Sequence, residues 1–219
     1  MPVAASTSDS RTLADLLEMV GDVPLARIRR PIGDATEDDV IHLLDGDDKH
    51  ICELIDGVLV EKTIGARESM IAAIVGRLLG NFVAEHHLGF MLTTDGPIRI
   101  RAGRIRFPDT CFVSWSQFPD GELPDQTIWD AVPDLAVEVI SEGNTRREME
   151  LKLADYFAAG VKIVWYLYPK TKTAIAYTSP TRKKEIAPTG SFDGGKVLPG
   201  FSLPLADVFA PPRRPKRLP

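Results

Sequence analysis

Pro133-Asp-Leu-Ala-Val-Glu-Val-Ile-Ser141 decides how this chain folds, because its apolar run over residues 135–140 predicts a short buried strand. Within that run only Glu138 is charged. Burying a carboxylate without a partner is costly, so Glu138 is either a functional ligand or an edge-strand glutamate paired with an arginine. Its neighbours Val137 and Val139 argue against a strand that faces solvent, and they favour the functional interpretation.

A helix predicted over residues 145–159 follows this strand, and Gly160 ends it. Around that helix Lys152 lies about 60° from Met149, at the border of the apolar stripe, so we expect its amine to reach the strand ends. Glu148 is expected farther round, toward solvent. The alternative is a surface ion pair between Glu148 and Lys152, which would stabilise the helix by only about 0.2 to 0.5 kcal/mol.

A second acid, Asp109, closes the motif Arg106-Phe-Pro-Asp109. We expect a strand over residues 105–115 to run through this motif, and the alternative role for Asp109 is that of a turn residue after the proline. Four arginines recur at or just before the motif: Arg99, Arg101, Arg104 and Arg106. They fit a solvated strand face as well as they fit a contact surface for nucleic acid.

Asp109 and Glu138, together with the backbone carbonyl of Val139, form a candidate site for Mg²⁺, with Mn²⁺ as a substitute. Mg²⁺ prefers oxygen ligands and keeps several waters, so two carboxylates and one carbonyl are enough protein. Such a cation polarises a phosphoryl oxygen and binds water, and Lys152 would orient or activate that water. The predicted chemistry is hydrolysis of a phosphodiester bond.

Two further glutamates are candidates to complete the site. The turn signal Asp56-Gly57 predicts a β-hairpin over residues 51–62, and Glu53 shares a strand face with apolar neighbours there. A long amphipathic helix is predicted over residues 66–84, with Glu68 in its first turn. The sequence leaves open which of the two glutamates contributes.

The 219 residues, 44% hydrophobic and 26% charged, predict one globular domain. We expect a partly flexible N-terminal arm over residues 1–35, the domain over residues 36–210 and a basic proline-rich tail over residues 211–219. Without a long apolar run or a basic leader, the sequence predicts a soluble, cytoplasmic protein with no membrane contact. Cys52 and Cys111 are then expected to be buried thiols.

Helices and strands alternate in mixed order, which predicts an α/β or α+β fold. The net charge of −5 argues against a protein that coats nucleic acid without specificity.

Several motifs, in this order, resemble those of the Uma-two family of bacterial endonucleases in the PD-(D/E)XK superfamily. They are Glu-Leu-Ile-Asp-Gly-Val-Leu-Val-Glu (53–61), Arg-Phe-Pro-Asp (106–109), Pro-Asp-Leu-Ala-Val-Glu-Val-Ile-Ser (133–141), Glu-x-x-x-Lys-x-x-x-Tyr-x-x-x-Gly (148–160) and Val-Trp (164–165). Two positions depart from the family pattern. Glu142-Gly143-Asn144 stands where the family usually has Pro-Ser, and Tyr168 stands where it commonly has an aspartate.

The resemblance implies a restriction-endonuclease-like core, in which helices flank a mixed central β-sheet, and a Mg²⁺ site. It matches Asp109 and Glu138 to the metal ligands and Lys152 to a signature lysine moved from the strand onto the following helix. Glu53 matches an early glutamate of the family. The implied function is that of a metal-dependent DNA endonuclease, and a homodimer would suit the cutting of both strands. The alternatives are a catalytically inactive nuclease fold that binds nucleic acid or regulates, and a structural or dimerisation role.

Overall fold

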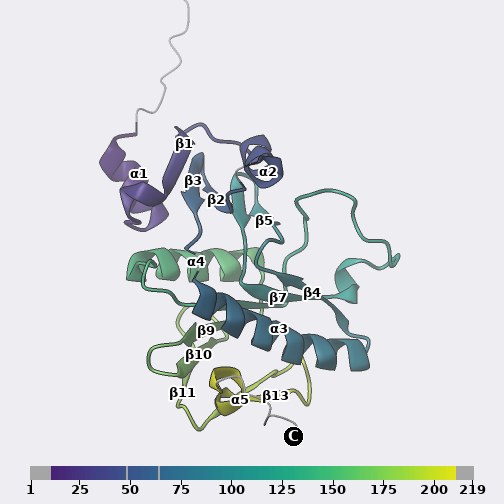
Figure 1. The fold of residues 1–219 in the computed structure, drawn as a ribbon. Coiled ribbons are helices and arrows are strands. Elements are labelled where there is room, and N and C mark those ends of the chain that lie inside the picture. Colours follow the sequence, from purple (N-terminus) through teal and green to yellow (C-terminus); the bar gives the residue numbers. More distant parts are fainter. Residues whose placement is uncertain (1–10, 48, 64, 211–219) are drawn as a thin grey trace, which may run out of the picture.

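The structure is a computed structural model that describes residues 11–47, 49–63 and 65–210 (Figure 1). Five strands form one sheet, in the spatial order β1 (Ile28–Ile32), β3 (Val58–Glu61), β2 (Cys52–Ile55), β6 (Arg104–Arg106) and β5 (Ile98–Arg101). Six strands form a second sheet, in the order β11 (Lys183–Ile186), β10 (Thr173–Tyr177), β9 (Ile163–Tyr168), β8 (Leu135–Val139), β7 (Thr110–Ser114) and β4 (Gly89–Thr93). A two-stranded ribbon comprises β12 (Ser191–Asp193) and β13 (Ser202–Pro204).

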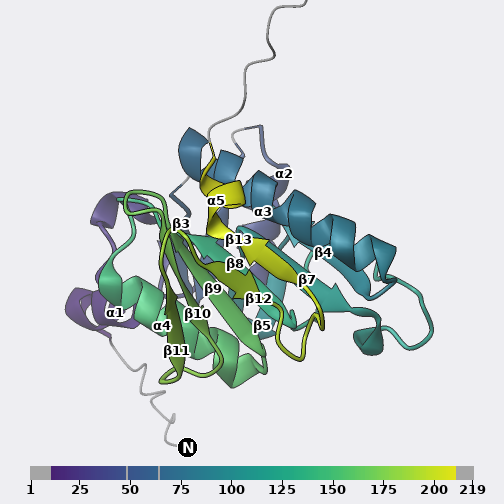
Figure 2. The ribbon, with the colours of Figure 1, turned by 90° about the horizontal axis from the view of Figure 1, so that it is seen from below.

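The six-stranded sheet is mixed, because β8 and β9 run parallel while its other neighbouring strands pair antiparallel. Figure 2 shows α3 (Ala66–Glu85) and α5 (Leu205–Phe209) on one side of this sheet and α4 (Arg146–Ala159) on the other. The α+β class and the mixed sheet flanked by helices, both expected from the sequence, are therefore confirmed.

Alternation along β8 decides which side chains meet which helix. Leu135, Val137 and Val139 belong to the hydrophobic core that includes α3, and Ala136 belongs to the core that includes α4. Because successive side chains of a strand point to opposite faces, Glu138 points to the α4 face. The apolar strand thus presents one carboxylate to one helix.

The N-terminal part of the described chain packs on the five-stranded sheet. Helix α1 (Leu13–Val20) places Leu16 and Val20 against strands β2 and β3, and α2 (Glu37–Asp45) packs on β2. Residues 11–35, assigned by the sequence to an N-terminal arm, include α1, a 3₁₀ turn (Leu25–Arg27) and β1, which pairs with β3. Residues 1–10 and the predicted tail over residues 211–219 lie outside the described residues.

The predicted hairpin is confirmed, because β2 and β3 pair antiparallel on either side of Asp56 and Gly57, whose φ values are positive at 46° and 91°. The single strand predicted over residues 105–115 is wrong. It is divided into β6 and β7, which lie in different sheets and are joined by Phe107-Pro108-Asp109. Proline has no backbone N–H to give to a ladder, so the pairing is interrupted there. Asp109 consequently lies at the junction of the two sheets.

Cys52 and Cys111 are both buried free thiols, as expected, and burial raises the pKa of each to about 12. A search of the described helices finds none with the length and apolar character needed to cross a membrane.

Candidate active site

Lys152 joins the two sheets through a pair of glutamates. Its Nζ lies 2.8 Å from Glu53 Oε1, on β2 of the five-stranded sheet, and 3.2 Å from both carboxylate oxygens of Glu138, on β8 of the six-stranded sheet. The three side chains are at most 5% exposed. The chain therefore brings together three of the residues that the sequence singles out, and Lys152 does reach the strand ends.

The alternative for Lys152, a surface ion pair with Glu148, is wrong. Glu148 does not face solvent as its helical position suggested. It is buried, and Arg27 holds both of its carboxylate oxygens at 2.7 and 2.9 Å. Asn144 and the Thr145 amide also donate to Glu148 at the start of α4, but Arg27 comes from the N-terminal segment, which helical geometry alone does not place.

Both glutamates have further partners besides Lys152. Glu53 accepts hydrogen bonds from Arg106 Nη1 at 2.5 Å and from the backbone N–H of Phe107 at 3.3 Å. The hydroxyl of Tyr156, one turn after Lys152 on α4, donates to Glu138 Oε1 at 2.5 Å. Every carboxylate of this cluster is thus compensated, which is what burial of charge requires.

Charge and burial shift the pKa values in this cluster in opposite directions. Burial raises the pKa of Glu53, but the positive charges of Lys152 and Arg106 outweigh that effect and lower it to about 2. Burial raises the pKa of Glu138, and Lys152 counteracts only part of the shift. Burial lowers the pKa of Lys152, whereas the two glutamates raise it to a value above its usual 10.5. Lys152 is accordingly an ammonium at neutral pH.

Asp109 lies beside β8 but binds a different lysine. Lys62 Nζ donates to Asp109 Oδ1 at 2.7 Å and to the carbonyl of Phe107 at 2.6 Å. Asp109 Oδ2 accepts the backbone N–H of Val139 at 2.6 Å, and the Asp109 N–H donates to Val137. These contacts place the Asp109 carboxylate next to the strand that carries Glu138.

Lys62 was not predicted from the sequence, because it belongs to no motif of its own. The only signal in the chain is a lysine directly after the apolar strand of the hairpin. Because its partner Asp109 lies 47 residues away, the contact depends on how the two sheets meet.

The four arginines at positions 99, 101, 104 and 106 do not form a free surface, and not all of them face solvent. Arg104 and Arg106 are buried, and both bind Asp155 on α4. Arg104 also binds Asp56, while Arg99 binds Glu37. For the two buried arginines the solvated-face interpretation is wrong, since their ion pairs with Asp155 connect β6 to α4, the helix that carries Lys152.

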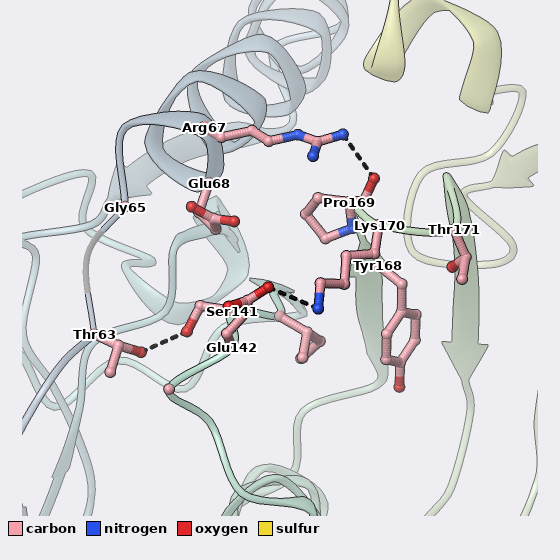
Figure 3. A pocket seen from close by; sticks show the side chains of 12 residues that line it. Thr63, Gly65, Arg67, Glu68, Ser141, Glu142, Tyr168, Pro169, Lys170 and Thr171 are labelled. Atoms are coloured by element: carbon pink, nitrogen blue, oxygen red, sulfur yellow. Dashed lines mark hydrogen bonds and ion pairs between the residues drawn. The ribbon is translucent and has the colours of Figure 1, made fainter.

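A pocket of about 880 Å³ lies close to Asp109, although Glu53, Asp109, Glu138 and Lys152 are not among its lining residues (Figure 3). It begins next to the contacts of Asp109, because Thr63 follows Lys62 and Ile140 follows Val139 in the chain. The pocket is lined by Thr63, Gly65, Arg67, Glu68, Ile140, Ser141, Glu142, Gly143, Tyr168, Pro169, Lys170 and Thr171.

Side chains across this pocket are already paired. The hydroxyls of Thr63 and Ser141 lie 2.7 Å apart, and Lys170 binds Glu142 at 2.6 Å. Figure 3 shows Glu68 on α3 at the side of the pocket. Of the two glutamates proposed to complete the site, the structure therefore places Glu53 against Lys152 and Glu68 in the pocket.

The fit of a divalent cation can be judged from the donors present. In the described part of the chain, no three or more His, Cys, Asp or Glu residues group as a metal centre. Mg²⁺ needs fewer protein ligands than that, and carboxylates are the donors that it prefers. Asp109 and Glu138 are such donors, and the charge of Asp109 adds to the raised pKa of Glu138, a repulsion that a cation would relieve. The donor chemistry fits Mg²⁺ or Mn²⁺.

The fold is similar to that of a solved protein from Anabaena variabilis, described as "a putative nuclease belonging to DUF820". The TM-score is 0.68 at 17% identity, and the alignment covers 80% of this chain and 97% of that one. A search of curated proteins found no match.

A family model described as "Putative restriction endonuclease" matches residues 38–206, well over half of the chain. That range includes Glu53, Asp109, Glu138 and Lys152. The resemblance drawn from the ordered motifs is thereby confirmed, and the chain belongs to the Uma2 family.

Proposed function

We propose that this protein is a metal-dependent endonuclease that hydrolyses phosphodiester bonds in DNA. The observation that supports the proposal most directly is the meeting of Lys152, Glu138 and Glu53 beside Asp109, from four separate segments of the chain. Burying so many charges is costly unless geometry compensates them, so their concentration at one strand end favours a functional site. Membership of the Uma2 family supports the same reaction class.

Asp109 and Glu138 would hold Mg²⁺ or Mn²⁺, with the carbonyl of Val139 as a third protein ligand. The bound cation supplies Lewis acidity at the phosphoryl oxygen and lowers the pKa of water. Lys152 keeps its proton, because Glu53 and Glu138 hold its pKa above the usual value. Its role is therefore to orient the attacking water and to stabilise negative charge on the phosphate, with attack in line on phosphorus.

Glu53 is a positioning residue in this proposal. It contacts Lys152 at 2.8 Å and is itself fixed by Arg106 and the Phe107 amide. With its pKa near 2 it carries a full negative charge at neutral pH. That charge keeps the ammonium of Lys152 aimed between the two sheets.

The neighbouring pocket suits the path of a nucleic-acid strand. Hydroxyls and basic side chains are the groups that most often contact phosphate and sugar, and Thr63, Arg67, Ser141 and Lys170 all line it. Glu68 and Glu142 line it as well, so the formal charge of the pocket is close to balanced. Binding is accordingly expected to be weak in the absence of a divalent cation. A homodimer would place two such sites on opposite strands.

One observation favours a second candidate, a nuclease fold that binds nucleic acid or regulates without turnover. The Asp109 carboxylate is already paired with Lys62, and that of Glu138 is paired with Lys152 and accepts a hydrogen bond from Tyr156. The cluster is therefore complete without a cation. This candidate predicts DNA binding that requires no metal and leads to no cleavage.

The two candidates are separated by incubating the protein with supercoiled plasmid and linear duplex, with Mg²⁺, with Mn²⁺ or with chelator. We expect metal-dependent cleavage, and we expect Asp109→Asn to abolish it while thermal unfolding shows that the variant is folded. The matched control is Asp95→Asn, which changes a more exposed aspartate paired with Lys49. Cleavage by Asp109→Asn at the wild-type rate would contradict the proposal. Retained binding without any cleavage by the wild type would favour the second candidate.

A further inference from the structure

Lys62 already engages the Asp109 carboxylate, which would have to bind a cation in the proposed site. Its ammonium contacts Asp109 Oδ1 at 2.7 Å, and the other oxygen of that carboxylate is engaged by the Val139 amide at 2.6 Å. The pair is mostly removed from water, since the Lys62 side chain is 7% exposed and that of Asp109 is 15% exposed. An ion pair shielded in this way is screened little by salt, so it is a strong competitor for the carboxylate.

We propose that Lys62 competes with the divalent cation for Asp109 and thereby sets the metal affinity of the site. The inference rests on the proposed function, because it concerns the same metal site. A lysine ammonium is a compact point charge on a flexible stem, and it can leave a carboxylate by rotation about its side-chain bonds alone. The backbone of Lys62 stays in place, because its N–H donates to Ile51 at 2.8 Å.

Two like charges close to the same carboxylate repel each other, which makes the competition unavoidable. A divalent cation held by Asp109 and Glu138 would bind two carboxylates that Lys62 and Lys152 already contact. Lys152 has a second carboxylate, Glu53, at 2.8 Å and remains compensated when Glu138 turns to a metal. Among the described residues Lys62 has one carboxylate at ion-pair distance, Asp109, and otherwise hydrogen-bonds to the Phe107 carbonyl, although its charge also lowers the pKa of Glu53 and of Glu138. Lys62 is therefore the cation that has to move.

Because Lys62 has to be displaced, the unliganded protein binds the metal weakly. Removing the Lys62 charge therefore strengthens metal binding, whereas removing a residue that supports the metal ligands weakens it. This direction separates competition from a merely structural role. A lysine needed only to support Asp109 would, when replaced, lower the metal affinity.

The test is a titration of the full chain with Mn²⁺ alone, in which electron paramagnetic resonance measures the concentration of free Mn²⁺. We expect Lys62→Met to bind Mn²⁺ at least ten times more tightly than the wild type. Lys49→Met is the matched control, because Lys49 forms a more exposed pair with Asp95 and its loss changes the net charge equally. That control should bind as the wild type does, and adding Asp109→Asn to Lys62→Met should abolish the gain.

Equal or weaker binding by Lys62→Met, with binding still dependent on Asp109, would overturn the inference and leave the metal site standing. No binding by any variant would overturn both the inference and the metal dependence of the proposed function.

A second measurement needs no substitution at Lys62, in case that variant fails to fold. The wild type is labelled with an amine-reactive reagent with and without Mg²⁺, and the labelled lysines are identified by mass spectrometry. Faster labelling of Lys62 in Mg²⁺, with Lys49 unchanged, is expected if the ion displaces the ammonium. Unchanged or slower labelling of Lys62 would contradict the competition.

Discussion

Arg27 and Glu148 lie 121 residues apart in the sequence and form a two-pronged ion pair, with Nη1 and Nη2 at 2.9 and 2.7 Å from the two carboxylate oxygens. Arg27 also donates to the carbonyls of Gly143 and Glu61. The N-terminal segment is thereby joined to the first turn of α4, the helix that carries Lys152. The position of the lysine thus depends on residues that precede the hairpin.

Replacing Arg27 by Met should destabilise the protein by about 3 kcal/mol, because Glu148 would be left buried without its charge partner. Chemical denaturation followed by tryptophan fluorescence measures the loss. Arg146→Met is the control, since Arg146 pairs with Glu150 where the two side chains are 93% and 60% exposed, and its loss should leave the stability nearly unchanged. Similar losses of unfolding free energy for the two variants would contradict a stabilising role of the Arg27–Glu148 ion pair.

Lys152→Met should lower the free energy of unfolding by about 3 to 5 kcal/mol, since two buried glutamates lose the same partner. Adding Glu138→Gln should restore part of that loss, because the amide keeps a polar group for Tyr156 without the uncompensated charge. Urea titrations of the single and double variants form a thermodynamic cycle. Additive losses would show that Lys152 and Glu138 do not interact.

Gly21→Ala and Gly160→Ala should differ in cost although both glycines have positive φ, 85° and 105°. At Gly160 an added Cβ meets nothing within 4 Å, so only the left-handed backbone is penalised, by about 1 to 2 kcal/mol. At Gly21 the Cβ would lie 2.5 Å from the Glu148 backbone, which adds about 1 to 3 kcal/mol of overpacking. Thermal unfolding of both variants tests the difference, and equal losses would show that the N-terminal segment can move away from α4.

The stability contributed by Asp134 should be lost in acid. Burial raises the pKa of this carboxyl, but hydrogen bonds from Lys162 and from the Ser114 amide outweigh burial and hold the pKa below 3.8. A carboxyl whose folded pKa is lowered stabilises the fold above its unfolded pKa, and the contribution falls as the pH drops through the lower folded value. Urea unfolding of the wild type and Asp134→Asn between pH 6 and pH 3 measures it. The variant should show the shallower decline, and parallel curves would contradict the assignment.

The local sequence pattern was sufficient to predict the strand and the helix that carry the site residues. The apolar run over residues 135–140 predicted a buried strand with Glu138 as its charged member, and β8 has that form. The helical period placed Lys152 at the border of the apolar stripe. In the structure α4 begins after its N-cap residue Thr145 and ends at its C-cap residue Gly160. These features depend on neighbours within a few residues, so they can be inferred from sequence alone.

Pairing between segments was decided by the tertiary structure. The division of residues 105–115 between two sheets, the contact of Lys62 with Asp109 and the burial of Glu148 under Arg27 all join positions that no local period relates. Sequence determined which residues could carry charge into the core, because strand and helix periodicity is a property of the backbone. Only the packing of α4 between the two sheets decided which acid meets which base, because a buried charge takes the partner that the register of distant strands brings within reach.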